Sequence, residues 1–315
     1  MTSVRNKIVF VLIGLIIFAS CGNETGDSDD RNSITIGLML ALDSFPIIVA
    51  YELGFFEAEN LQVNIEIFAS ATERNIAFQT IDEMDGIMLD FVALATFQEA
   101  GFDVVVPSNI LGLSGIIGAF DVHNVDDLRG NTVLMAFNSA MHYILHTALT
   151  QSGMVPEDVY MTEIPSVPTR MEMLLNNQAA AATLPEPFIT IAQLQGLNVV
   201  ATTRDLGINP FGLGFRREAM EQKPAEFQAF FRAINAAVEH LNAADRGAYV
   251  DMLIDTAGFP EHLRGSMEMP IFTRFELPSE ADLNNVFDFA RDIGFLTIPI
   301  TAQDVLFDPF AHAIN

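Results

Sequence analysis

Hydrophobic and polar positions follow each other in a pattern that predicts short strands and helices in turn along most of the chain. The first clear example is the nearly continuous apolar run Ile34–Leu42, which is typical of a strand buried on both faces. Asp43-Ser44 interrupts this run, and Pro46 suits the first turn of a helix over residues 47–53. Gly54 suits the end of that helix. The segment therefore predicts a strand, a tight polar turn and a helix.

The same pattern continues to the end of the chain. Strands are expected at residues 63–68, 85–89, 104–107, 110–120, 132–137, 159–164, 179–184, 197–202 and 211–215. Helices are expected at residues 91–100, 141–152, 168–176, 189–195, from 218 onward, at 249–255 and at 278–293. The strand–helix pattern starts anew near residue 121, and the chain returns to the first series of strands near residue 211. This predicts two α/β lobes with parallel sheets, joined by crossings near 118–121 and 207–212, and a cleft between them.

The N-terminal residues have the pattern of a secretion signal. A short basic start is followed by the apolar segment Ile8–Phe18, which is shorter than the roughly 20 residues of a membrane span. Phe18-Ala19-Ser20-Cys21 resembles a bacterial lipobox. We therefore expect residues 1–20 to be a lipoprotein signal peptide, Cys21 to carry lipid, and residues 21–32 to form a flexible tether. A plain signal peptide with an incidental cysteine is the alternative.

Composition narrows the range of partners. The 315 residues carry a formal net charge of −26, and half of them are apolar. Apolar content of this size excludes disorder for most of the chain, and the negative charge disfavours nucleic acid and anionic membrane surfaces as partners. The acidic, lysine-poor surface fits either a salt-adapted protein or an ordinary soluble one. Membrane contact is expected only through the lipid anchor.

Residues just past the expected strands, all of them polar except Phe45, are the candidate binding residues. Because ligands of open α/β sheets bind at the carboxyl ends of the strands, we expect these side chains to face the cleft. The first lobe supplies Asp43, Ser44, Phe45, Ser70, Thr72, Glu73 and Asp90, and the second supplies Asn138, Ser139, His142 and Glu186. Each could instead be a helix cap or turn residue, and Ser70 with Glu73 has the spacing of a capping box.

The candidate residues indicate the charge of a ligand. Acidic side chains dominate, and Arg74 at the edge is the one basic residue among them, so a bound anion would meet repulsion. We expect a neutral or cationic, nitrogen-bearing small molecule, with an anion such as nitrate or a sulfonate as the alternative. Aromatic faces for a flat ring could come from Phe45, Phe137, Tyr143 and Phe188, unless these are core residues.

The sequence gives little support for catalysis. His142 and His146 lie one helical turn apart, a spacing that can bind a metal, but no third ligand follows nearby. The chain contains no Gly-x-Ser-x-Gly, phosphate-binding loop or dinucleotide fingerprint, and a single cysteine allows no internal disulfide or cysteine cluster. We expect no metal, no cofactor and no enzymatic activity. A purely structural surface lipoprotein would be expected to show repeats or a coiled coil.

Short motifs resemble one family over roughly residues 34–300. They are Gly54-Phe55-Phe56, Leu61-Gln62-Val63, Asp127-Leu128-Arg129-Gly130, Ile164-Pro165-Ser166, Arg170-Met171-Glu172, Asn176-Asn177-Gln178-Ala179, Leu184-Pro185-Glu186-Pro187-Phe188 and Lys223-Pro224-Ala225. Together they resemble the substrate-binding proteins of ABC importers for nitrate, taurine, alkanesulfonates and thiamin-pyrimidine precursors. The resemblance implies a two-lobed periplasmic-binding-protein fold of type II, with lobe 1 at 33–118 and 212–315 and lobe 2 at 119–211.

The same resemblance implies a function. Proteins of this family capture a solute outside the cytoplasmic membrane and deliver it to a permease that a separate ATPase subunit drives. We accordingly expect a monomer that is anchored to a bacterial membrane. One branch of the superfamily is an enzyme, the fungal pyrimidine synthase, whose pattern needs a cysteine-rich iron-binding segment. This chain has only Cys21, so the enzyme is a remote alternative.

Overall fold

The computed structural model describes residues 32–311, apart from Leu40, Ala69, 245–248, Leu253, 255–260 and 265–269. The expected signal peptide, Cys21 and nearly all of the expected tether lie outside the described residues, as does part of the helix expected at 249–255. Within the described part of the chain, none of the helices combines the length and the apolar character needed to cross a membrane.

The first of two sheets has the strand order β2-β1-β3-β10-β4. Its strands are β1 (Ser33–Met39), β2 (Gln62–Phe68), β3 (Gly86–Asp90), β4 (Val104–Asn109) and β10 (Phe211–Arg216). β1 pairs in parallel with β2 and β3, whereas β10 runs antiparallel between β3 and β4. β10 fits closely against β3 because Gly86 has no side chain. A Cβ atom at that position would lie 2.1 Å from the ring of Phe215.

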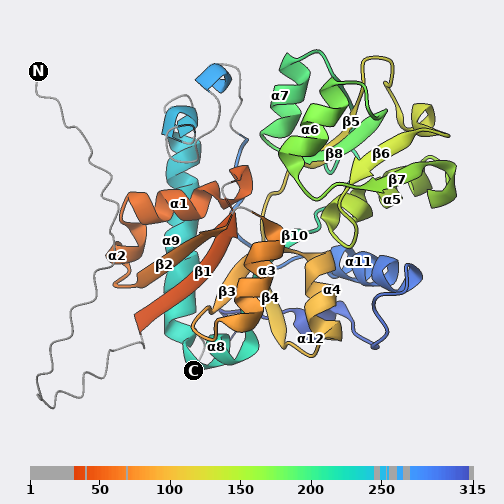
Figure 1. Cartoon of the computed structure of the whole chain (residues 1–315). Helices are drawn as coiled ribbons and strands as arrows, with labels where there is room; N and C mark the ends of the chain where they lie inside the picture. The colour runs from red at the N-terminus through yellow and green to blue at the C-terminus, as the bar shows by residue number, and fades with distance from the viewer. Residues whose placement is uncertain are drawn as a thin grey trace, which may run out of the picture. The chain divides into compact units, whose positions relative to one another are not determined.

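The second sheet has the order β7-β6-β8-β5-β9 and the same design (Figure 1). Its strands are β5 (Ser114–Gly118), β6 (Thr132–Met135), β7 (Tyr160–Glu163), β8 (Ala181–Pro185) and β9 (Asn198–Thr202). β6 pairs in parallel with β7 and β8, and β5 runs antiparallel between β8 and β9. Each sheet therefore contains one reversed strand. The expectation of purely parallel sheets is wrong, because β5 and β10 enter their sheets from the opposite direction.

The chain passes between the sheets twice, through residues 110–113 and 203–210. The first crossing comes earlier than the expected 118–121, because β5 belongs to the second sheet although the sequence placed it in the first lobe. Ser114 is the one polar residue of the apolar, glycine-containing segment 110–120, and a single serine is too weak a signal to mark this change of sheet. The second crossing overlaps the expected 207–212. The two-sheet α/β architecture is confirmed.

Helices cover both faces of each sheet. Among the described residues, the α-helices with both ends defined are α1 (Phe45–Glu52), α2 (Phe55–Ala58), α3 (Ala71–Thr80), α4 (Phe91–Glu99), α5 (Ala140–Gln151), α6 (Val167–Leu175), α7 (Phe188–Leu194), α8 (Arg217–Gln222), α9 (Pro224–Ala243), α11 (Glu280–Asp292) and α12 (Ala302–Val305). Short 3-10 helices are η2 (Leu42–Ser44), η3 (Val125–Leu128), η4 (Pro156–Asp158) and η5 (Glu261–Leu263). On the first sheet, α1 and α9 share one core while α4 and α11 share another. On the second sheet, α5 packs in one core and α6 and α7 in the other.

Local sequence signals explain several of these elements. The phenylalanine stripe of α9 is core, as its helical spacing predicts: Phe227 and Phe230 are fully buried against Phe215. Gly54 has φ 75°, the left-handed conformation that suits glycine after a helix. Ser70 caps α3, where its Oγ accepts the Glu73 N–H at 3.2 Å.

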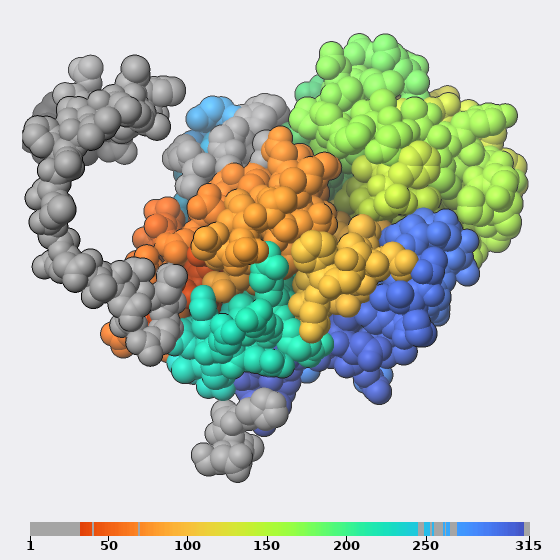
Figure 2. All heavy atoms as spheres, turned by 60° about the horizontal axis from the view of Figure 1, so that its bottom comes forward, coloured from red at the N-terminus to blue at the C-terminus, as the bar shows by residue number. Residues whose placement is uncertain are grey.

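A cluster of rings joins α5, from the second sheet, to α11, from the first. The ring of Phe289 on α11 lies 5.1 Å from His142, 5.4 Å from Tyr143 and 4.9 Å from His146, all on α5. His142 also packs edge-to-face on Phe137. In the space-filling view, the blue segment that carries α11 adjoins the yellow-green second-sheet segment (Figure 2). This ring cluster is a contact between the lobes in addition to the two crossings.

Burial in this cluster disfavours the charged form of its histidines. It lowers the pKa of His142 from 6.5 to about 4, with a smaller contribution from nearby His146. Burial also lowers the pKa of His146, although Asp292 on α11 opposes that change. His142 Nδ1 has no hydrogen-bond partner among the described residues. Its imidazole is therefore held neutral in an apolar contact.

We predict that this contact weakens in acid. Between pH 6.5 and 4 the unfolded chain binds more protons at His142 than the native state does, so stability is highest above pH 6.5 and declines as pH falls. Urea unfolding at pH 7.5 and 4.5 should show that the wild type loses about 2–3 kcal/mol more than His142→Leu. The variant is the needed reference because Asp43 has a raised pKa and therefore stabilises the native state as pH falls, which partly hides the loss at His142 in the wild type. Equal losses in the two proteins would contradict this account.

Candidate functional site

A cavity of about 590 Å³ lies between the two sheets. Its walls come from the ends of β1, β3 and β8, from segments just past β1, β2, β6, β7 and β8, and from the first residues of β5 and β10. Because β5 and β10 are reversed, their amino ends meet the carboxyl ends of the parallel strands. The strand ends of both sheets therefore meet at the cavity, and its position follows from the strand order of the two sheets.

Five of the predicted site residues line the cavity. Asp43, Ser70 and Asp90 come from the first sheet, and Ser139 and Glu186 from the second. Arg74, on the same side of α3 as the Ser70 cap, lines it too. Of the suggested aromatic side chains, Phe188 is at the cavity wall. Five residues that are far apart in the sequence thus lie at one cavity, as the position of each past a strand end predicts.

The other predicted residues lie elsewhere. Ser44 is fully buried, and its Oγ donates to the Met39 carbonyl at 2.7 Å and accepts the Ala41 N–H at 3.3 Å. Phe45 is a core residue, 6.3 Å from the ring of Tyr249. Both residues stabilise the turn after β1 rather than contact the cavity.

Of the four predicted site residues that remain, three are exposed and one is buried in the ring cluster. Thr72 and Glu73 are exposed on α3, because helical geometry turns them away from the side that carries Arg74. Asn138 is an exposed turn residue with φ 52°, a conformation that asparagine tolerates better than most residues. His142 lies in the contact between α5 and α11 described above. None of these four lines the cavity.

Arg170 is the main residue that the site prediction missed. It lies on α6, past the end of β7, and lines the cavity although it is only 1% exposed. The sequence did contain a signal, because Pro165–Arg170 follows an expected strand just as the other candidate segments do. Apolar side chains complete the wall, among them Met39, Met88 and Leu113.

Asp43 is the most unusual carboxyl group of the cavity. Burial raises its pKa to about 6, and backbone N–H groups and the nearby charge of Arg74 offset only part of that effect. Its Oδ1 atom is shielded from solvent and has no hydrogen-bond partner among the described residues. A buried acceptor of this kind is energetically costly unless a partner satisfies it.

The other two carboxyl groups are engaged by their own helices. Asp90 caps α4, where its Oδ1 accepts the Ala93 N–H at 2.9 Å. Glu186 accepts the Thr190 N–H at 3.2 Å and the Thr190 hydroxyl at 3.1 Å. Burial raises the pKa of both groups, and these hydrogen bonds oppose the rise. Both carboxylates therefore stabilise the start of the helix that follows them.

Two arginines balance these acids. Burial lowers the pKa of Arg74 and of Arg170 to about 10, so both stay protonated at neutral pH. Arg74 donates from Nε and Nη2 to Asn75 Oδ1, at 3.2 and 2.8 Å. Arg170 donates from Nη1 to the carbonyls of Ile164 and Pro165, at 2.7 and 3.3 Å. The cavity is therefore a polar site of mixed charge.

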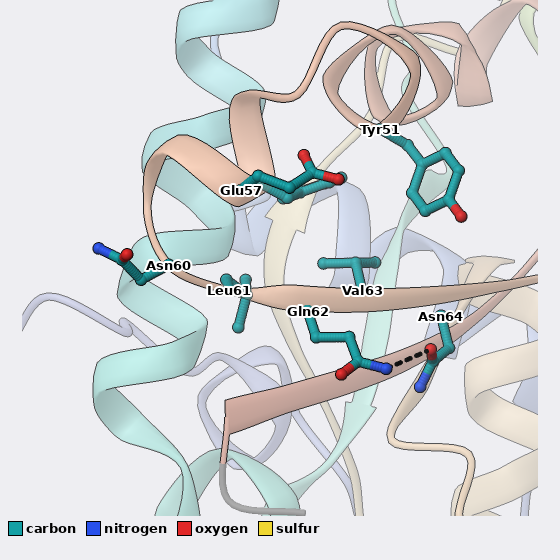
Figure 3. A pocket seen from close by; sticks show the side chains of 8 residues that line it. Tyr51, Glu57, Asn60, Leu61, Gln62, Val63 and Asn64 are labelled. Carbon is teal, nitrogen blue, oxygen red and sulfur yellow. Dashed lines mark hydrogen bonds between the residues drawn. The ribbon is translucent and has the colours of Figure 1, made fainter.

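A second hollow of about 380 Å³ lies against β2, the edge strand of the first sheet (Figure 3). Its polar side chains include Glu57, Asn60 and Gln62, and Gln62 donates to Asn64 at 3.3 Å. All its walls come from one sheet and its covering helices, so it lacks the two-sided construction of the first cavity. Among the residues that the structure describes, no group of three or more His, Cys, Asp or Glu side chains could hold a metal.

Comparisons with solved structures agree on the fold. The aliphatic sulphonate-binding protein SsuA of Escherichia coli matches with a TM-score of 0.76 and 18% identity, over 87% of this chain and 97% of that protein. The nitrate-binding protein NrtA of Synechocystis matches with a TM-score of 0.68 and 15% identity, over 87% and 84%. The desulfurization enzyme DSZB matches with a TM-score of 0.66 and 14% identity, over 89% and 97%. At these identities the likeness shows a shared fold, the two-lobed fold of periplasmic binding proteins.

Sequence comparison gives the family. No curated protein matches the sequence. A family model described as the NMT1-like family matches residues 27–254, which is more than two thirds of the chain and includes strands of both sheets. The chain therefore belongs to the NMT1-like family.

Proposed function

We propose that this protein is an extracytoplasmic solute-binding protein that captures a small molecule in the cavity between its two sheets. The observation that carries this proposal is a cavity built from both sheets, in which a buried carboxylate oxygen of Asp43 has no partner among the described residues. Its volume lies within the usual range of small-ligand sites. The binding proteins among the structural neighbours support the same role.

The proposed mechanism is capture, closure and delivery. A ligand that contacts both walls draws the lobes together, and the crossings at 110–113 and 203–210 act as the hinge. The closed form then delivers the ligand to a membrane permease of an ABC importer. The sequence has no phosphate-binding loop, so a separate ATPase subunit supplies the energy. We infer that the protein acts as a monomer.

We propose a neutral or cationic, nitrogen-bearing ligand, of which a pyrimidine-type vitamin precursor is one example. Three carboxyl groups at the cavity, Asp43, Asp90 and Glu186, favour N–H donors and oppose a free anion. Arg170 is the observation that favours the alternative, an anion such as an alkanesulfonate, taurine or nitrate. The sulphonate-binding and nitrate-binding neighbours support that alternative as well.

We propose binding rather than catalysis. DSZB has the same fold, so the fold alone is compatible with an enzyme. In this cavity, however, Asp90 and Glu186 accept hydrogen bonds from helix residues and Arg170 donates to a backbone carbonyl. Among the described residues, none of these three groups is paired as a nucleophile with its base. The remote alternative of a pyrimidine synthase is not favoured by any residue at this site.

A thermal-shift screen of the full chain tests the proposed function. The compounds should include vitamins, pyrimidines, amines, sulfonates and nitrate. A true ligand at 100 times its dissociation constant should stabilise the protein by roughly 2.7 kcal/mol. We expect a nitrogen-bearing compound to give this effect. A response to nitrate or a sulfonate, with none from ring-nitrogen compounds, would show that the charge argument is wrong.

We further propose that lipid at Cys21 anchors the protein outside the cytoplasmic membrane, with residues 21–32 as the tether. In cells that express Cys21→Ser, the protein should move from the membrane pellet to the soluble fraction. A Ser20→Ala variant keeps the cysteine and serves as the control, which should stay in the pellet. Lipid attachment at Cys21 is wrong if the Cys21→Ser protein remains in the pellet.

A further inference from the structure

Two charged side chains of the cavity, on walls from different sheets, keep polar atoms without partners. Asp43 Oδ1, past the end of β1, accepts no hydrogen bond from the described residues. Arg170 Nε, on α6, donates none. Leaving a buried charged group unsatisfied costs more than a typical hydrogen bond contributes. These two atoms are therefore the strongest candidates for direct contacts with a ligand.

The remaining charged side chains of the cavity are already engaged. Asp90 caps the start of α4, and Glu186 accepts two hydrogen bonds from Thr190 in the first turn of α7. Arg74 directs Nε and Nη2 to the side-chain oxygen of Asn75. A ligand that recruited any of these groups would have to compete with an existing bond. Asp43 Oδ1 and Arg170 Nε present no such competition.

The bonds of Arg170 decide which edge of its guanidinium is available. Nη1 donates to the carbonyls of Ile164 and Pro165, and these bonds fix the plane of the group. Neither Nε nor Nη2 donates to any residue that the structure describes. The Nε–Nη2 edge carries two parallel N–H groups, the arrangement that binds a carboxylate in a bidentate manner. Arg170 therefore suits the carboxylate end of a ligand.

Asp43 suits the opposite kind of group. An ionised carboxylate only accepts hydrogen bonds, so its free oxygen requires an N–H or O–H donor. With a pKa of about 6, the group is mostly ionised at pH 7.5. A protonated amine provides both the donor and the opposite charge, and bonds of this type are shorter and stronger than neutral ones.

We propose that Asp43 and Arg170 recognise opposite ends of one dipolar ligand, a small amino carboxylate whose amine bonds to Asp43 and whose carboxylate bonds to Arg170. This inference rests on the proposed function and names the ligand class more narrowly. Because the two residues lie on walls from different sheets, a ligand with both ends makes a charged contact with each lobe. Both atoms are shielded from solvent in this structure.

Matched probes test the two-ended recognition. The full chain is titrated with straight-chain amino carboxylates from glycine to 6-aminohexanoate, and with the alkylamine and the alkanoate of each length. Phosphate buffer at pH 7.5 brings no amine, carboxylate or sulfonate of its own. At least one amino carboxylate should raise the melting temperature at a tenfold lower concentration than its single-ended relatives need. The proposal is overturned if no member of the series does so.

Variants assign the two ends. Asp43→Asn should bind the best amino carboxylate no better than the matched alkanoate, and Arg170→Gln no better than the matched alkylamine. Arg170→Lys keeps the charge but removes the planar fork, so it should lose at least tenfold in affinity. Glu172→Gln changes an exposed residue of the same helix and should bind as the wild type does. Circular dichroism confirms that each variant is folded. Unchanged preferences in folded Asp43→Asn and Arg170→Lys would also overturn the proposal.

The outcome is separable from that of the proposed function. If a pyrimidine or another nitrogen compound stabilises the protein while every amino carboxylate fails, the solute-binding role stands and the two-ended recognition is wrong. If an amino carboxylate binds and both variants lose their preference, both proposals are supported together.

Discussion

The exchange of one reversed strand between the sheets is the constraint on which the rest of this structure depends. After β4 the chain leaves the first sheet, and its next strand, β5, runs antiparallel in the second sheet. After β9 the chain returns, and β10 runs antiparallel in the first sheet. Every parallel strand of both sheets then ends where these two strands begin. The cavity is formed at that meeting point without any inserted loop or extra domain. The same two crossings are the covalent links between the lobes, so the cavity and the proposed hinge have one origin.

Burial at this meeting point determines the chemistry of the site. The residues Asp43, Asp90 and Glu186 are each partly withdrawn from water, and burial raises the pKa of each carboxyl group. For Asp90 and Glu186, the free N–H groups at a helix start oppose this effect, and the side chain serves the fold. Asp43 and Arg170 each keep one buried polar atom without a partner among the described residues. The fold thus separates acidic residues that bond to helix starts from two charged residues that keep an unpartnered polar atom in the described part of the chain.

Much of the fold could be predicted from the sequence because its signals are local. The apolar run before Asp43 became β1, and the spacing of Phe227 and Phe230 gave the core face of α9. The strand-end argument placed Asp43, Ser70, Asp90, Ser139 and Glu186 at the cavity for the same reason. What local patterns do not contain is the partner of a strand. The position of β5 depends on pairing with β8 and β9, residues far away in the sequence, so its sheet was assigned wrongly.

Side-chain direction limited the site prediction in a similar way. Phe45 and His142 follow strand ends as Asp43 does, yet tertiary packing turns them into the core and into the ring cluster around Phe289. Arg170 is the converse case, since its helix brings to the cavity a charge that the sequence did not single out. A single substitution at such a position changes the charge of the site without changing the pattern of strands and helices.

The central claim is that a small molecule bound between the two sheets brings the lobes together. Small-angle X-ray scattering of the full chain, with and without a saturating compound of proven binding, measures this most directly. The account predicts a smaller radius of gyration for the complex, and no such change when the same compound is added to Asp43→Asn. An unchanged radius at saturation would contradict it and would indicate a static binding site.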